Sequence, residues 1–254
     1  MNIISDIDFY DFYFNGHYLS EFGGYVGSTS GGLKTYSLLP SRSFTTDKPL
    51  NYDGEIVFES RLEPRKFNVP VVFDDIDEVG IRKIASWLDV QNDTMFFFRD
   101  DNLYLNVSIN SQDCDFGTIS GVDGEIDIAF IAHDPYFYDR NLTKYSITDV
   151  EKDRKYAIIN SGSVESFPTI TVTNEDTFTI NLFDRNRKLI QSFTVEYPNG
   201  TVVIDSKYCT CSRGDKNLFN YINGEFLNIP SGVSYISFSK DVESVNIEFR
   251  PRSK

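Results

Sequence analysis

The residue types that could carry out a reaction are few, and they do not form a recognisable catalytic set. The chain has only two histidines, His17 and His133, and neither stands in the spacing of a serine-nucleophile motif or a zinc-protease motif. His133 and Asp134 are adjacent, and adjacent residues on a strand point to opposite faces of a sheet. The 38 acidic residues leave a glycosidase pair open, but no spacing selects one. We therefore expect a protein that is not an enzyme.

Metal-binding patterns are equally incomplete. Cys209 and Cys211 form a Cys-x-Cys pair, which is half of a zinc site, but no further Cys or His lies near them. With Cys114 they make an odd count, which is typical of free thiols from a reducing compartment. The acids from Asp74 to Glu78 lack the ligand spacing of an EF-hand and suit the start of a helix better. The sequence predicts no metal and no cofactor.

Negative charge is concentrated in the first half of the chain. The formal net charge is -14; residues up to Asp139 contribute 24 acids and 9 bases, and the remainder contributes 14 acids and 15 bases. Such a chain lacks the basic surface that binds nucleic-acid phosphates or anionic membranes. The asymmetry predicts two units, residues 1–139 and 140–254, with no specific nucleic-acid binding and no membrane insertion.

The first unit is expected to consist of short strands and one helix. Residues 9–14 end at the turn signal Asn15-Gly16, and residues 23–32 form a glycine–serine loop without the Gly-Lys-Ser/Thr of a phosphate-binding loop. Asp75 to Glu78 fits a capping box with Asp75 as N-cap, and the apolar residues that follow, Trp87 among them, have helical spacing. Further strands are expected at 55–59, 68–73, 95–98, 103–109 and 125–132. This pattern predicts a barrel-like or sandwich-like β domain with one helix.

The second unit is expected to be a β-sandwich. Residues 141–163 are polar and are interpreted as a connector, and about eight short strands follow without a helix. Asn223-Gly224 predicts a two-residue hairpin between strands at 218–222 and 225–229. This half contains no Trp and no His, so we expect no tight binding of galactosides. No apolar run approaches the length of about 18 residues that spans a membrane, and no secretory signal is expected.

Several segments, in this order and spacing, resemble one family. They are Phe12-Tyr13-Phe14-Asn15-Gly16 with Phe22-Gly23, Arg61-Leu62-Glu63-Pro64-Arg65, Trp87-Leu88, Phe96 to Asp101, Gly124 to Phe130 with Asp134-Pro135-Tyr136, Ile204-Asp205, Leu227 to Gly232 and Arg250-Pro251-Arg252. Together they resemble the distal tail protein of bacteriophages with long non-contractile tails. The motif residues taken as structural are Phe14, Asn15, Gly16, Arg61, Pro64, Arg65, Trp87, Leu88, Asp134 and Pro135.

The resemblance implies a structural tail-tip hub. Family members form a hexameric ring from their N-terminal domains, which joins the tail tube to the tail-tip protein that carries the fibre or lysin and lets DNA pass during ejection. The partners implied are five further copies, the major tail tube protein, the tip protein and the tape measure protein. The location implied is the tip of the virion tail, after assembly in the cytoplasm of the host bacterium. The implied C-terminal domain is a galectin-like β-sandwich, and this sequence has no insertion there long enough to hold receptor-binding proteins.

Two further expectations concern the acids of the first unit and an alternative function. If the first unit lines a ring channel, its acids would repel passing DNA phosphates over about 8–10 Å, whereas the alternative is that they simply keep the ring soluble. The candidate channel acids, chosen because they lie in or beside turns, are Asp47, Asp53, Glu55, Asp113, Asp115 and Asp123. The alternative function is a carbohydrate-binding adhesin module, which would be monomeric.

Overall fold

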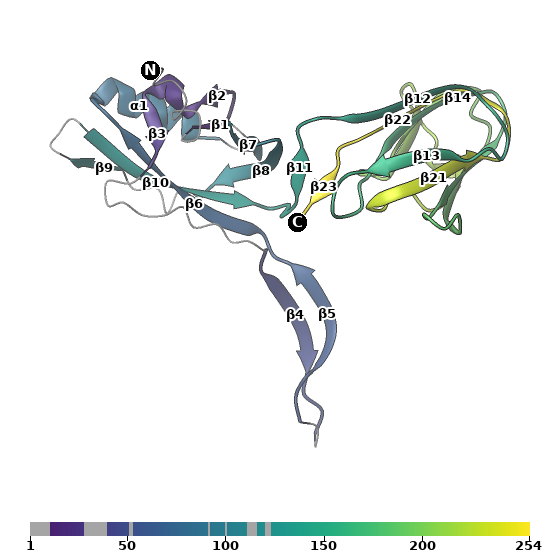
Figure 1. The fold of residues 1–254 in the computed structure, drawn as a ribbon, viewed down its shortest axis with the longest axis horizontal. Helices are drawn as coiled ribbons and strands as arrows, with labels where there is room; N and C mark the ends of the chain where they lie inside the picture. The colour runs from purple at the N-terminus through teal and green to yellow at the C-terminus, as the bar shows by residue number, and fades with distance from the viewer. Residues whose placement is uncertain are drawn as a thin grey trace, which may run out of the picture. The chain divides into compact units, whose positions relative to one another are not determined.

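The computed structural model describes residues 11–27, 40–50, 53–90, 92–99, 101–110, 116–119 and 123–254. In these residues it confirms the expected mainly β architecture with one α-helix (Figure 1). The chain divides into two compact units, residues 1–137 with Lys254, and residues 138–253. No helix of the described ranges is long and apolar enough to cross a membrane.

The first unit is built on one sheet. Its strand order is β2-β1-β7-β8-β10-β6-β3, with β9 paired to β10 and with a separate two-stranded ribbon formed by β4 and β5. The elements are β1 (Phe12–Phe14), β2 (His17–Tyr18), the 3-10 helix η3 (Leu19–Phe22), β3 (Gly24–Val26), β4 (Arg42–Asp47), β5 (Ile56–Leu62), β6 (Arg65–Phe73), α1 (Glu78–Leu88), β7 (Thr94–Phe98), β8 (Leu103–Ile109), β9 (Phe116–Ile119) and β10 (Asp123–Ala132). The strand β11 (Phe137–Asp139) follows at the boundary between the units.

The Asn15-Gly16 turn is confirmed. Asn15 has φ 43 and Gly16 has φ 86, and the turn brings Phe14 opposite His17 in an antiparallel pair. Left-handed backbone at both central positions is the geometry that Asn-Gly adopts readily and that matches the twist of a hairpin. A local signal therefore determined this turn.

The helix is confirmed, but its predicted N-cap is wrong by two residues. Asp77 is the N-cap, and its carboxylate accepts the main-chain N–H of Gly80 at 2.7 Å. Asp75 instead has φ 54 and lies in the bend before the helix. Both acids precede the same apolar stripe, and the one that reaches a free N–H of the first turn becomes the cap.

The core of the first unit is aromatic, and α1 is fixed to it by two reciprocal hydrogen bonds. Trp87 is buried and stacks on Phe22 with ring centroids 4.6 Å apart. Its indole Nε1 donates to the carbonyl of Phe14 at 2.8 Å, and Asn15 Nδ2 donates to the carbonyl of Trp87 at 2.9 Å. These bonds connect the end of the helix to the first hairpin, so the motif residues around Asn15 and Trp87 form one structural cluster.

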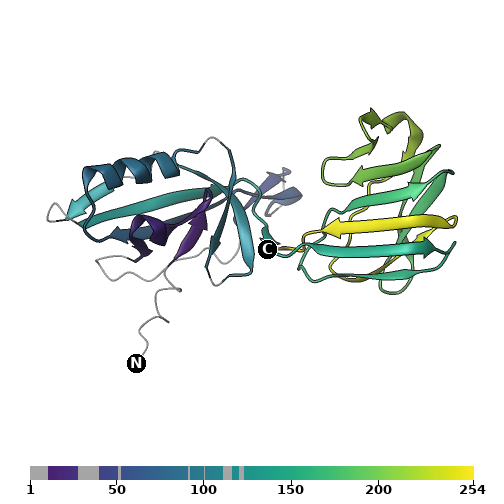
Figure 2. The ribbon, with the colours of Figure 1, turned by 90° about the horizontal axis from the view of Figure 1, so that it is seen from above.

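The second unit is a sandwich of two antiparallel sheets (Figure 2). A six-stranded sheet has the order β12-β22-β14-β17-β18-β19, and a five-stranded sheet has the order β13-β21-β15-β16-β20. The elements are β12 (Thr143–Val150), β13 (Tyr156–Asn160), β14 (Thr169–Asn174), β15 (Phe178–Phe183), β16 (Leu189–Val195), β17 (Gly200–Asp205), β18 (Thr210–Arg213), β19 (Lys216–Asn217), the 3-10 helix η5 (Phe219–Tyr221), β20 (Ile222–Gly224), β21 (Gly232–Phe238), β22 (Val242–Phe249) and β23 (Arg252–Ser253). One continuous apolar core, which includes Phe178, Phe193 and Phe238, lies between the sheets.

The interpretation of residues 141–163 as a polar connector is wrong. This segment contains β12 and β13, each at an edge of its sheet. Val150 and Ile158 are buried, whereas most alternate positions are exposed. An edge strand with one solvated face needs few apolar residues, which is why the composition resembles a linker.

The two-residue hairpin predicted at Asn223-Gly224 is also wrong. Both residues belong to β20, which pairs with β16, and Phe193 lies opposite Gly224. Residues 225–228 form no strand. Gly224 has φ 105, and a Cβ built there would overlap the carbonyl oxygen of Ser192. The glycine is therefore required by close backbone packing and not by a turn.

We predict that Gly224→Ala is more destabilising than Gly200→Ala. Both glycines have positive φ, but a Cβ at Gly200 would meet nothing within 4 Å. Backbone strain alone costs about 1–3 kcal/mol, and the overlap at Gly224 adds about 1–3 kcal/mol. Urea denaturation of the full chain would measure the difference, and equal losses for the two variants would contradict the packing role of Gly224.

Candidate functional site: a projecting hairpin and its base

The hairpin formed by β4 and β5 projects from the sheet of the first unit (Figure 1). Its strands pair only with each other among the described residues, and every residue from Arg42 to Asp47 is exposed. An isolated two-stranded ribbon is at most marginally stable in water, because neither face is covered. This segment therefore presents two open faces and two open edges for contact with another molecule.

One face of the hairpin is polar. Ser43 lies opposite Arg61, and Thr45 lies opposite Glu59, so these four side chains share a face. Arg61 Nε donates to Glu59 Oε1 at 2.7 Å, and both side chains are largely exposed. An exposed pair of this kind contributes little to stability, and the side chains of this face are polar groups that are compatible with exposure to water.

The hairpin also carries exposed apolar side chains, which we call the apolar patch: Phe44, Val57 and Phe58. Their exposed fractions are 57%, 55% and 67%. Phe44 lies opposite Ser60, and Val57 lies opposite Thr46, so Phe44 and Val57 lie on the face opposite the polar one. A register shift between Thr45 and Thr46 leaves Phe58 without a cross-strand partner. Three large exposed apolar side chains gathered on one ribbon are typical of a contact surface.

The far end of the hairpin is acidic. Asp47, Asp53 and Glu55 lie there and are exposed, so the structure brings together three of the six candidate channel acids. Lys48 Nζ lies 2.9 Å from Glu55 Oε1, and hydrogen bonds from Lys48 and then Thr46 lower the pKa of Glu55. Of the other three, Asp113 and Asp115 lie outside the described residues, and Asp123 begins β10.

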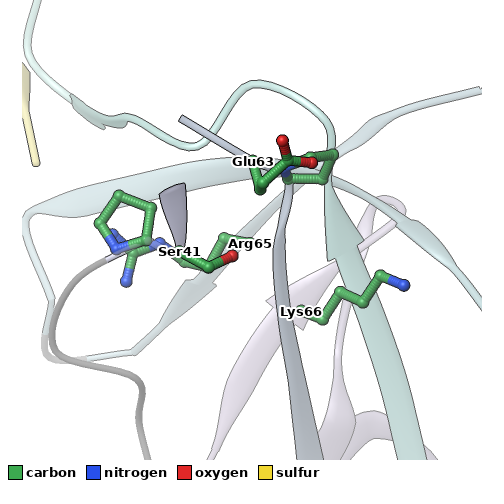
Figure 3. Close-up of a pocket in the computed structure, with 6 residues that line it drawn as sticks. Ser41, Glu63, Arg65 and Lys66 are labelled. Atoms are coloured by element: carbon green, nitrogen blue, oxygen red, sulfur yellow. The ribbon is translucent and has the colours of Figure 1, made fainter. Parts of the chain in front are cut away.

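The base of the hairpin holds a pocket of about 340 Å³ beside Arg65. Ser41 and Pro64 line it, and Arg65 and Lys66 leave the strand in opposite directions (Figure 3). Arg65 Nε donates to the carbonyl of Pro135 at 3.4 Å, and its guanidinium lies 4.8 Å from the ring centroid of Phe137. Burial lowers the pKa of Arg65. The motif segments around Arg65 and Pro135, which are 70 residues apart, therefore meet where the hairpin leaves the sheet.

The remaining motif residues have structural contacts. Leu88 packs against the aromatic core, and Asp134 accepts the main-chain N–H of Tyr136 at 3.3 Å. His17 contacts Glu21 at 2.8 Å, and His133 Nε2 lies 3.2 Å from Ser108 Oγ, both at exposed positions. No group of three metal-ligating side chains occurs within the described part of the chain. The contacts described do not assemble a nucleophile, a base and an orienting acid.

Neither β4 nor the apolar patch was predicted from the sequence. Residues 42–47 carry one large apolar residue and no alternation toward a core, which is the signal used to predict strands. Asp53-Gly54 lies between β4 and β5, and Gly54 has φ 107. Asp-Gly is a frequent hairpin turn pair, so this dipeptide is the feature of the sequence that indicates the β4–β5 hairpin.

Comparisons with known proteins show similarity to phage tail proteins. Residues 7–122 match the family described as phage tail protein N-terminal domain. The fold of the whole chain is similar to that of the Dit protein of phage SPP1, a hub adsorption apparatus protein of phages that infect Gram-positive bacteria. The TM-score is 0.72 and the identity 16%, over 96% of this chain and 98% of that one.

A second similar structure is the baseplate of phage P2 in its activated conformation with calcium. The TM-score is 0.46 and the identity 9%, over 85% of this chain and 89% of that chain. The comparison with curated proteins found no match.

The Cys-x-Cys pair does not present two thiols on one face. Cys209 is exposed and has φ 52 in the turn before β18, whereas Cys211 is buried in the core. Burial raises the pKa of the Cys211 thiol to about 11. The two residues would share a face on a regular strand, and the turn at Cys209 removes that arrangement.

We predict that Cys209 reacts with iodoacetamide in the folded protein and that Cys211 reacts only after unfolding. The thiolate is the reactive form, and a buried thiol with a raised pKa is both uncharged near pH 8 and inaccessible. Peptide mass spectrometry after timed alkylation would measure both rates. Similar rates for the two cysteines in the native protein would contradict this assignment.

Proposed function

We propose that this protein is a hub subunit of a phage tail tip. Six copies form a closed ring through their first units, and the ring joins the tail tube to the tip protein that carries the fibre or lysin. Its role is structural and not enzymatic, and its place is the tip of the virion tail. The observation that carries the proposal is the apolar patch on the projecting hairpin of a phage tail protein N-terminal domain. The fold similarity to the SPP1 hub protein supports it.

A projecting hairpin suits a head-to-tail ring. If the hairpin docks against a different surface of a neighbouring copy, the contact is heterologous, and heterologous contacts generate a ring when their rotation closes. Covering the apolar patch removes Phe44 and Phe58 from water at every contact. Each phenylalanine contributes about 1.5–3 kcal/mol when buried. The patch therefore supplies the free energy that a contact between copies requires.

We expect the double variant Phe44→Ser, Phe58→Ser to lose the ring. Removing both rings weakens each contact by about 100-fold or more, and a six-membered ring depends on every contact. Mass photometry of the wild-type protein should give six times the 29.1 kDa of one chain, whereas the double variant should give the mass of one chain.

Phe219→Ser is the matched control. Phe219 is 61% exposed, which is close to the exposure of the two hairpin rings, but it lies in η5 of the second unit. This variant should remain a hexamer. A wild-type protein that stays monomeric at high concentration, and that forms no ring in isolated tails, would refute the hub proposal.

The proposal also assigns a role to the acidic end of the hairpin. We expect Asp47, Asp53 and Glu55 to border the channel, where negative charge prevents duplex phosphates from adhering within about 8–10 Å. A basic lining would instead release counterions and bind DNA tightly. The triple variant Asp47→Lys, Asp53→Lys, Glu55→Lys should assemble into tails and eject its genome more slowly, most clearly at low salt.

A triple variant of the second unit controls for net charge. Glu175, Asp215 and Glu225 are exposed, and changing them to lysine alters the charge of the chain by the same amount. Ejection in vitro should keep its wild-type rate in this control. If the hairpin variant also ejects at the wild-type rate at low salt, the acids serve only to keep the ring soluble.

A further inference from the structure

The outer face of the five-stranded sheet holds two cations over two aromatic rings. Phe183 and Tyr235 are cross-strand partners on β15 and β21, so their rings lie side by side. Lys155 Nζ is 3.8 Å from the ring centroid of Phe183, and the Arg187 guanidinium is 5.2 Å from that of Tyr235. Lys155 Nζ also donates to the carbonyl of Arg187 at 3.3 Å. The two positive charges are thus fixed close to one another.

These cations have no acidic partner. Neither Lys155 nor Arg187 lies within ion-pair distance of a carboxylate in the described part of the chain, and both side chains are exposed. Asp184 is the nearby acid in the same turn, and its Oδ1 accepts the main-chain N–H groups of Asn186 and Lys188 at 2.9 and 2.8 Å. Arg185 and Lys188 add two more cations to this turn. Positive charge therefore exceeds negative charge at this end of the sheet.

A pocket of about 520 Å³ lies at the same turn. Asp184, Arg185 and Asn186 line one side, and Ser231, Val233 and Ser234 contribute to the rest. Ser234 is almost fully buried, and its Oγ has no hydrogen-bond partner in the described structure. Because Ser234 is adjacent to Tyr235 on β21, its hydroxyl lies on the other face of the sheet from the two rings. The residues that the pocket adds to the outer face are therefore those of the turn and Val233.

The same outer face continues as a row of uncharged polar side chains. Asn181 Oδ1 accepts from Ser192 Oγ at 3.0 Å, and the hydroxyls of Thr179 and Thr194 lie 2.9 Å apart. Thr179, Asn181 and Phe183 alternate along β15, so they share one face. Hydroxyl and amide groups suit a ligand rich in hydroxyls, and the adjacent cations suit one that carries negative charge.

We propose that this face binds an anionic carbohydrate, in which a phosphate or carboxylate contacts Lys155 and Arg187 and the sugar hydroxyls contact the polar row. Both ring faces are covered by the cations, so stacking of an uncharged sugar on Phe183 or Tyr235 is not the main contact. Residues 1–139 carry a net charge of -15. The acidic first half of a neighbouring copy is therefore the competing ligand for the two cations. The site does not depend on ring formation.

Biolayer interferometry of the full chain on immobilised polysaccharides tests the proposal. Phosphorylated mannan, polygalacturonate and neutral mannan present a phosphate, a carboxylate and no charge. We expect binding to one or both anionic polymers, weaker binding at high salt, and no comparable binding to neutral mannan. Comparison of binding to phosphorylated mannan and to polygalacturonate shows whether the site recognises phosphate or carboxylate.

Variants locate the binding. Lys155→Met and Arg187→Met should each weaken binding about tenfold, because each removes a charge-assisted contact. Lys216→Met is the matched control, since Lys216 also lies over a tyrosine, 5.6 Å from the ring centroid of Tyr221, in another part of the unit. The control should bind as the wild type does, and all variants should keep the wild-type melting temperature.

Several outcomes would overturn the proposal. These are equal binding to neutral mannan, no binding to either anionic polymer, or equal losses for Lys216→Met and the site variants. A change in oligomer mass caused by Lys155→Met or Arg187→Met would show that the cations contact a neighbouring copy instead. Because the hairpin variants test the ring separately, failure of the carbohydrate site leaves the hub proposal intact.

Discussion

A two-stranded ribbon cannot bury its own apolar side chains, and this constraint governs the first unit. The sheet of this unit has its own aromatic core, and that core does not include β4 or β5. Phe44, Val57 and Phe58 therefore remain in water in a single chain. Exposed apolar area of this kind favours association, because burial removes it from water. We infer that the hairpin reaches its stable form when another molecule covers it.

Long-range contacts in the first unit join the helix to the first turn and fix the base of the hairpin. Trp87 and Asn15 connect the helix to the first turn by hydrogen bonds of 2.8 and 2.9 Å. Arg65 connects the start of β6 to the chain after β10 through the carbonyl of Pro135 and the ring of Phe137. A contact element is specific when its supporting residues are held in place, and the Arg65 contacts lie where the hairpin joins β6.

The parts that the sequence predicted well are those with local causes. The Asn15-Gly16 turn depends on two residues, and the helix depends on one apolar stripe. The choice between Asp75 and Asp77 as N-cap depends on the backbone conformation before the helix, which the sequence pattern does not show. The edge strands in residues 141–163 were missed because their outer faces are polar. Asn223-Gly224 was assigned to a turn because its pairing with β16 is not visible in sequence. Neither the apolar patch nor the cation pair was predicted. Lys155 precedes β13, and Phe183 and Tyr235 come from two other strands, so their proximity depends on the fold, and the hairpin faces no core.

Photocross-linking from the hairpin tests the central claim most directly. A benzoylphenylalanine residue at position 58, in an equal mixture of unlabelled and ¹⁵N-labelled protein, would report which molecule covers the apolar patch. We predict cross-linked peptides of mixed isotope composition, with both ends in residues 1–137. Cross-links confined to one chain in a sample of assembled rings, or only to a different tail protein, would contradict a ring closed by this hairpin.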